Sequence, residues 1–274
     1  MIIDCHTHFF PEPLFKAIWK WFDEHAWEIR YKIQADAIAD QLIKAGIHRY
    51  VILNYAHKAG MSEALNAWTY YFAQKHAEAI PFGTVHPDDD DVEKVLENCF
   101  IKYQFSGLKF HSHVTAIRPD DERLFPIYEK LIEHDKILML HAGTGPSLHG
   151  YHEKTECVSG ARFVKPVVKK FPKLKLIIPH LGVEESEAFF DLMEEFPNLW
   201  MDTTMAVSGY FPIRIPWDLI EKYSDRIIYG SDFPNIPYDI KTEILAIQNS
   251  PLSTPAKNKI LYQNAERIFL INKS

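Results

Sequence analysis

Two histidines one residue apart begin the candidate chemistry of this 274-residue chain. His6 and His8 follow an apolar run at residues 1–3, which is typical of the start of a strand. In an extended strand the side chains alternate between two faces, so both imidazoles point the same way. Neutral imidazole offers a lone pair at physiological pH and is the commonest protein ligand for a metal ion. The pair therefore indicates part of a metal site, provided that further ligands lie nearby.

Three later segments share one form: a short apolar run reaches a His or an Asp and is followed by a Gly or Pro turn. The residues at these run ends are His141, His180 and Asp232. In a parallel α/β barrel the carboxyl ends of the strands meet at one face, where the active site lies. We therefore expect these three side chains to gather beside His6 and His8.

Eight strands that alternate with helices would position these residues, and the sequence shows that pattern. The strand-like runs are residues 2–8, 49–53, 80–85, 106–113, 137–141, 174–180, 199–202 and 227–232. The segments between them have the periodicity of helices and are joined mostly by short loops. This alternation predicts an α/β fold with parallel strands, closed as a (β/α)8 TIM barrel. Because the candidate ligands span residues 6 to 232, we expect a single domain over residues 1–274.

Composition and charge exclude several classes of protein. Hydrophobic residues make up 47% of the chain, which is ample for a large core. The net charge of −7 and the lack of a basic run argue against nucleic acid or an anionic membrane as the partner. No apolar run is long enough to span a membrane, and no signal-peptide pattern is visible. Three scattered cysteines fit reduced thiols better than disulfides, so we expect a cytoplasmic protein.

The order of these motifs resembles the metal-dependent amidohydrolase superfamily. The segments IDCHTHFFPE, HLG, YGSDFP and NAERIF are similar to its amidohydrolase-2 branch, which includes aminocarboxymuconate-semialdehyde decarboxylase. The resemblance extends from the first residues to the last helix. It implies a TIM-barrel enzyme that uses a divalent metal ion and acts on a small-molecule substrate.

The candidate ligands suit a catalytic metal site. Zinc takes nitrogen and oxygen ligands, and a catalytic site keeps one position for a water whose pKa the ion lowers toward neutrality. One divalent ion, which we expect to be zinc, would be held by His6, His8, His141 and Asp232. The resemblance also gives Asp232 a catalytic role, in which its carboxylate takes a proton from the water and passes it to the leaving group. It makes His180 the catalytic histidine that polarises the substrate or carries a proton.

Lys109 and His111 are further candidates, because they share one face of the expected strand at 106–113. In binuclear relatives a lysine on the fourth strand is carboxylated and bridges two ions, whereas in many mononuclear members it is no bridge. We prefer a buried Lys109 paired with a carboxylate such as Asp4. His111 could contact the substrate or be a hydrogen-bonded histidine of the barrel. Arg162 could bind a substrate carboxylate through its guanidinium, or be an exposed arginine at a helix start.

We expect a metal-dependent hydrolase that uses a metal-activated water on a small amide, lactone or ester. The alternative is a metal-dependent, non-oxidative decarboxylase of an unsaturated or aromatic carboxylic acid, since the same branch contains such enzymes. A barrel that binds metal without catalysis ranks last because all the candidate ligands are present, and a metal-free lactonase is a minor variant. The aromatic helix expected at residues 14–27 could cap the barrel mouth or pack on a second subunit in a homodimer.

Overall fold

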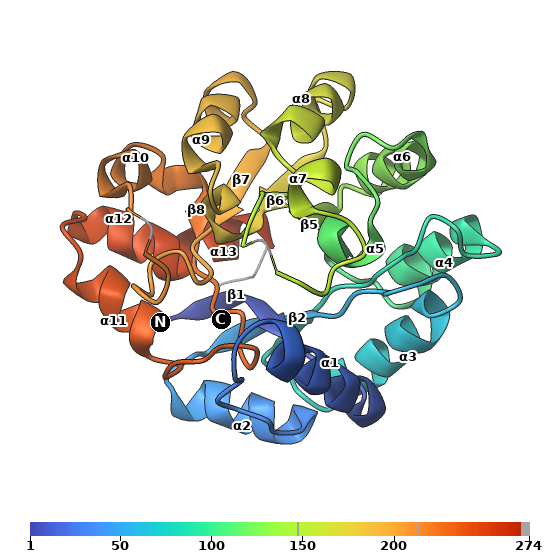
Figure 1. Ribbon diagram of the computed structural model, residues 1–274, viewed down its shortest axis with the longest axis horizontal. Helices are drawn as coiled ribbons and strands as arrows, with labels where there is room; N and C mark the ends of the chain where they lie inside the picture. Colours follow the sequence, from blue (N-terminus) through green and yellow to red (C-terminus); the bar gives the residue numbers. More distant parts are fainter. Residues whose placement is uncertain (147, 213, 270–274) are drawn as a thin grey trace.

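The computed structural model describes residues 1–146, 148–212 and 214–269. Within these residues, parallel strands surround the centre of the molecule and helices cover their outside (Figure 1). The strands are β1 Ile3–His8, β2 Arg49–Leu53, β3 Ala79–Pro81, β4 Gly107–His111, β5 Ile137–His141, β6 Lys175–Ile178, β7 Leu199–Asp202 and β8 Ile227–Ile228. They pair in chain order as one sheet of β1 to β3 and one of β4 to β8.

Backbone hydrogen bonds join these two sheets on both sides. Between β3 and β4, the N–H of Gly83 donates to the carbonyl of Gly107 at 2.9 Å. Between β8 and β1, the N–H of His8 donates to the carbonyl of Phe233 at 2.8 Å. The strands therefore form a closed ring, and the expected (β/α)8 barrel is confirmed.

Helices pack their apolar stripes against the outside of this barrel. In α2, for example, Ile38, Ala39 and Leu42 recur at helical spacing and are buried. The helices are α1 Glu12–His25, α2 Ala35–Lys44, α3 Ser62–Ala73, α4 Val92–Glu97, α5 Ser112–Thr115, α6 Phe125–Glu133, α7 Thr155–Val158, α8 Ala161–Lys170, α9 Ser186–Glu195, α10 Trp217–Lys222, α11 Thr242–Asn249, α12 Thr254–Asn258 and α13 Asn264–Ile268. In the part of the chain that the structure describes, none of them has the length and apolarity needed to cross a bilayer.

Side chains of alternate residues in each strand point either into the barrel or outward to the layer beneath the helices. In β5, Leu138 and Leu140 belong to the large apolar cluster that includes the helices, whereas Ile137 and Met139 belong to a smaller cluster. By the same alternation, His141 follows Met139 on the inner face. The lower barrel is thus filled by apolar side chains, and the polar strand ends project into its mouth.

Four expected strands end earlier than the sequence pattern indicated. The strand predicted at 174–180 ends at Ile178, where a 3₁₀ helix over Pro179–Gly182 begins. The strand predicted at 80–85 is reduced to β3, which ends at Pro81. The strand predicted at 106–113 ends at His111, where α5 begins and turns the chain. The strand predicted at 227–232 stops at β8, because the chain bends across β1 at Gly230, where an added Cβ would lie 2.6 Å from the Cβ of His6.

Candidate metal centre and active site

Three of the four expected metal ligands lie together where β8 meets β1. The candidate ligand atoms of His6, His8 and Asp232 all lie within 4.8 Å of one another, and we call these residues the mixed group. Oδ1 of Asp232 is 3.0 Å from Nε2 of His8 and 3.4 Å from Nε2 of His6. Asp232 follows His8 by 224 residues in the chain. The closure of the barrel between β8 and β1 brings the two residues together and so creates this group.

A tight turn after β8 aims Asp232 at the histidines. Its backbone has a φ of +64°, a left-handed conformation that aspartate tolerates better than most residues, and its N–H donates to the carbonyl of His6 at 2.9 Å. Burial by itself would raise the pKa of Asp232, but His8, and after it His6 and His180, outweigh burial and hold that pKa below its usual range. The side chain is therefore an ionised carboxylate, the form that binds a cation.

Asp202, the last residue of β7, orients His6. Its Oδ2 lies 2.8 Å from Nδ1 of His6, and its Oδ1 accepts the backbone N–H groups of His180 at 2.8 Å and Thr204 at 3.0 Å. Because a carboxylate only accepts, Nδ1 of His6 carries the proton and Nε2 keeps the lone pair that faces Asp232. We did not single out Asp202 from the sequence, although it ends a strand in the same way as His141.

Hydrogen bonds also fix the protonation of His141. Nδ1 of His180 lies 3.0 Å from the carbonyl of Thr204 and must donate to it, so Nε2 of His180 accepts from Nδ1 of His141 at 3.2 Å. Nε2 of His141 then keeps a lone pair, and it is buried without a hydrogen-bond partner among the described residues. A buried lone pair without a partner is costly unless a cation or a donor reaches it, as a metal ligand requires.

His141 belongs to a second group, together with His111 and His113, whose candidate ligand atoms also lie within 4.8 Å of one another. We call these three residues the imidazole group. His180 lies between the two groups, with its ring centroid 5.4 Å from that of His6 and 4.7 Å from that of His141. The structure thus brings all the expected ligands to one mouth but places His141 at its β5 side.

Burial keeps the imidazole group neutral. It lowers the pKa of His113 to about 4 and that of His111 and His141 well below the usual range, and the neighbouring histidines lower them further. The mixed group and His141 together offer three imidazoles and one carboxylate. This set of nitrogen and oxygen donors fits a divalent ion such as Zn²⁺ or Mn²⁺.

Lys109 contacts the mixed group from the inside of β4. Its Nζ lies 3.2 Å from Nε2 of His6, so the expected pairing with Asp4 is replaced by a contact with a candidate ligand. Burial lowers the pKa of Lys109 to about 8, while the charges of Asp202 and Asp232 act in the opposite direction. An ammonium group therefore donates to the lone pair that a metal ion would take.

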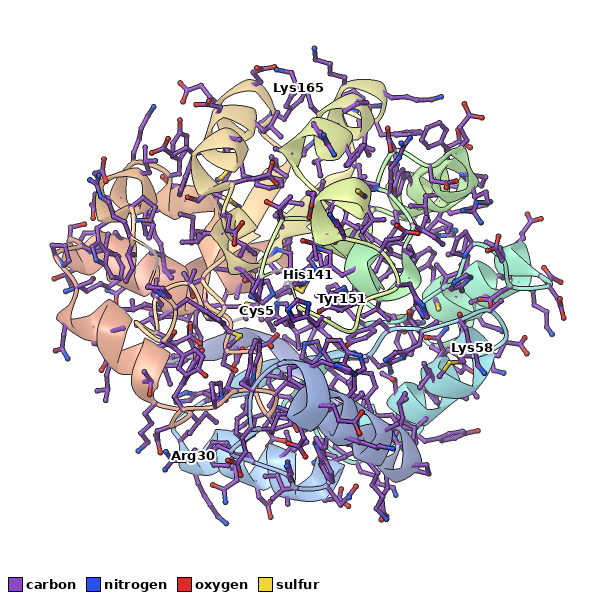
Figure 2. All side chains as sticks on the ribbon, in the orientation of Figure 1. Cys5, Arg30, Lys58, His141, Tyr151 and Lys165 are labelled. Carbon is purple, nitrogen blue, oxygen red and sulfur yellow. The ribbon has the colours of Figure 1, made fainter. Side chains whose placement is uncertain are left out.

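A cavity of about 350 Å³ extends outward from these residues. His8, His141, His180 and Asp232 are part of its lining, and His111 and His113 flank them. Its aromatic lining residues are Trp21, Phe22, Trp27, Tyr55, Tyr151 and Phe211. No lysine or arginine lines it among the residues that the structure describes. Figure 2 shows His141 and Tyr151 near the centre of the barrel mouth and the labelled cations Arg30, Lys58 and Lys165 farther out.

Helix α1 and the loop after β5 cover this cavity. Nε1 of Trp21 donates to the carbonyl of Gly150 at 3.3 Å, and the ring of Trp21 lies 5.0 Å from that of Tyr151. Tyr151 in turn packs 5.3 Å from the ring of His113. The aromatic helix thus caps the mouth, one of its two expected roles, while a homodimer through it stays a prediction.

Arg162 lies outside the cavity. It is exposed on α8, donates to the backbone carbonyl of Glu156, and stacks 4.6 Å from the ring of Phe163. The structure therefore does not bring Arg162 to the place where a substrate carboxylate would bind. Of the other candidates from the sequence, His111 lies at the cavity and Lys109 beneath it.

The sequence matches the family model described as Amidohydrolase over residues 3–271. The chain therefore belongs to this amidohydrolase family, and the resemblance to its amidohydrolase-2 branch is confirmed. No curated protein matches the sequence.

Solved structures with similar folds include enzymes and a protein described as uncharacterised. A TIM-barrel protein of that kind from Bordetella bronchiseptica is 17% identical, with a TM-score of 0.75 and 98% of each chain covered. A 2,6-dihydroxybenzoate decarboxylase from Rhizobium is 18% identical, with a TM-score of 0.73 and 99% of each chain covered. A dihydroxybenzoic acid decarboxylase from Polaromonas, solved with manganese and 2-nitroresorcinol, is 19% identical with a TM-score of 0.73, and 100% of this chain and 98% of that chain are covered. At these identities the similarity shows the shared fold.

Proposed function

We propose that the protein is a metal-dependent, non-oxidative decarboxylase of an aromatic hydroxy acid. The observation that carries this proposal is the cavity, which has aromatic walls, a His and Asp floor, and no lysine or arginine among its described lining residues. A planar ring fits between aromatic side chains, which bury large areas and stack favourably. A cation at the floor is then the partner that a substrate carboxylate needs.

The apolar walls favour loss of the carboxyl group. A carboxylate that enters such a cavity gives up its hydration, which is expensive unless a cation replaces it. When neutral carbon dioxide departs, the electron pair of the broken bond stays on the ring, where the charge spreads over many atoms until a proton neutralises it. A spread charge needs less hydration than a carboxylate, so the walls disfavour the ground state more than the transition state. An acid with a second carboxylate would leave one charge unpaired in the same cavity.

The residues at the floor would bind the metal ion and move the proton that the reaction needs. A divalent ion held by His6, His8, His141 and Asp232 would bind and polarise the oxygen atoms of the substrate. Decarboxylation replaces the carboxyl group on the ring carbon with a proton that is taken up from water. Because Asp232 is ionised at rest, we assign to Asp232 and His180 the relay of that proton from water to the ring carbon. Asp202 supports both steps, because it orients His6 and holds the backbone of His180.

The two dihydroxybenzoate decarboxylases with this fold support the aromatic substrate class. The manganese bound in the Polaromonas protein supports a divalent ion at this barrel mouth. The carboxylate ligand Asp232 suits manganese as well as zinc, so zinc stays a prediction.

A hydrolase is the second candidate, and one observation favours it. The pKa of Asp232 lies below its usual range because nearby histidines outweigh the effect of burial. A carboxylate that stays ionised beside a metal site can take a proton from water. This is the role that the hydrolysis of an ester, lactone or amide requires.

Product analysis separates the two candidates. The chain is loaded with Mn²⁺ or Zn²⁺ in separate samples and incubated with a panel of mono- and dihydroxybenzoic acids, and released carbon dioxide is measured. A parallel panel contains nitrophenyl esters, lactones and anilides. Carbon dioxide release that disappears in Asp232→Asn supports the decarboxylase. Hydrolysis of the second panel without carbon dioxide release from the first supports the hydrolase. Protein with confirmed metal content that turns over neither panel would contradict both.

A further inference from the structure

The mechanism above uses His141 but gives no task to its neighbours His111 and His113. We propose that the imidazole group is a second metal subsite, selective for divalent ions that prefer nitrogen ligands, such as Ni²⁺ or Zn²⁺. This subsite is independent of which reaction the mixed group supports. It also differs from a bridged pair of ions, because Lys109 contributes no ligand to it.

The surroundings of His113 determine which of its nitrogens has the lone pair. Its Nε2 lies 3.0 Å from the carbonyl of Gly143 and 2.7 Å from Oγ of Ser159. The single hydroxyl proton of Ser159 is taken up by carbonyl acceptors, those of Thr155 at 2.7 Å or Gly143 at 3.1 Å. Nε2 of His113 therefore carries the ring proton and Nδ1 keeps a lone pair, an arrangement that resembles the outer support of metal-bound histidines.

His141 brings a second lone pair of fixed position. Its Nδ1 proton is engaged by His180, so Nε2 is an acceptor that is buried without a partner in the described part of the chain. Nδ1 of His111 is likewise buried and lacks a described partner, and the whole His111 side chain is only 7% exposed. Two acceptors cannot satisfy each other, so the lone pair of His113 cannot serve Nε2 of His141, whose buried lone pair needs a cation or a donor from outside the protein.

The ring geometry places the three histidines of the subsite together. The rings of His113 and His141 lie 4.6 Å apart with their planes at 68°. The ring of His111 stacks on His141 at 4.0 Å with the planes only 9° apart. Candidate ligand atoms of all three residues lie within 4.8 Å of one another, so one ion between them can reach all three.

The donor types predict the selectivity. The imidazole group offers one ligand nitrogen from each of three rings and no carboxylate, and such sites hold Ni²⁺, Cu²⁺ and Zn²⁺ far better than Mn²⁺. The mixed group contains Asp232, whose hard oxygen also accepts Mn²⁺. Both groups can use His141, and it serves one ion at a time. When the imidazole group takes it, the mixed group still offers His6, His8 and Asp232 to its own ion.

Metal stoichiometry of the wild-type chain tests the subsite without any assumption about turnover. The chain is dialysed to equilibrium against Mn²⁺ or Ni²⁺, and the ions per chain are counted by elemental analysis. We expect about one manganese but about two nickel ions per chain, because only nickel suits both donor sets. One ion of either metal, or two of both, would overturn the proposal.

Two histidine variants locate the second nickel ion. His113→Ala should reduce nickel to about one per chain and leave manganese at about one, which also reports that the barrel is still folded. The matched control is His149→Ala, which removes an exposed imidazole from the loop after β5 and should keep both nickel ions. A second nickel ion that survives His113→Ala, or is lost in His149→Ala, would show surface binding and contradict the subsite.

Discussion

The two candidate metal-binding groups at the barrel mouth contain the same short His-x-His motif in two conformations. His6 and His8 lie within strand β1, so alternation turns both rings to the inside. His111 and His113 span the end of β4 and the start of α5, and the turn of the chain places their rings 5.6 Å apart. A His-x-His pair therefore predicts neighbouring imidazoles in both cases, but not the ligands that complete the site.

The surroundings of the two groups differ in charge. Asp202 accepts a hydrogen bond from His6, and Asp232 contacts His8, so both histidines of the mixed group lie against carboxylate oxygens. The imidazole group rests on Ser159 and backbone carbonyls, and no Asp or Glu side chain hydrogen-bonds to it within the described ranges. In our proposals the carboxylates would give the mixed group its reactivity and its tolerance of hard ions, and their absence would make the imidazole group a selective binder.

The largest effect should follow from removing the carboxylate of the mixed group. Asp232→Asn should lower turnover by about 10²–10⁴-fold, because it removes both a metal ligand and the group that moves a proton. Steady-state kinetics on the substrate found by product analysis measures this loss. The control is Asp218→Asn on the exposed surface of α10, which should retain wild-type rates. Full activity of Asp232→Asn would remove the functional distinction between the two groups.

The buried acids on the β1 and β8 side should also make stability depend on pH. Burial, and after it the charge of Asp4, raises the pKa of Glu243 in α11 well above its usual value. The folded chain then keeps a proton that the unfolded chain releases above about pH 4.5, so this residue lowers the free energy of unfolding as pH rises, by at most about 1.4 kcal/mol per pH unit. Urea denaturation should show this decline in the wild type and a flatter profile in Glu243→Gln. Equal profiles would contradict a protonated Glu243.

An intermediate effect is expected from the residue that orients His6. In Asp202→Asn an amide N–H can replace Oδ2, and it would force Nδ1 of His6 to accept and Nε2 to carry the proton. Manganese affinity should fall by about 10–100-fold, the usual cost of losing such support. Nickel binding that depends on His113 should not change, and a parallel loss there would show a general defect of the barrel mouth.

The smallest effect should come from the support of the imidazole group. Ser159→Ala removes one acceptor from Nε2 of His113 but leaves the carbonyl of Gly143 in place. Nickel affinity of the second subsite should weaken by less than about tenfold, as expected for one neutral hydrogen bond. Manganese affinity serves as the internal reference and should stay constant. A complete loss of the second nickel ion would mean that the serine holds the tautomer alone.

The sequence predicted the barrel and most of the site because both follow from strand ends. Apolar runs that reach His141 and Asp232 were enough to place these residues at one mouth. The same rule could have found Asp202, which was read only as the end of a strand. The division of His141 from the mixed group could not be predicted, because it depends on side-chain hydrogen bonds to His180. The place of His113 depended on the exact residue at which β4 ends.

The long separation between the ligands of the mixed group affects how the protein is made. During synthesis Asp232 emerges 224 residues after His8. Contacts so distant in sequence form late, because the chain loses the entropy of loop closure before it gains the free energy of the contact. Metal binding then adds its free energy to the last closure of the ring. Retention of an ion at the mixed group thus reports a chain that extends at least to Asp232, because a fragment released earlier has His6 and His8 but lacks the carboxylate of that group.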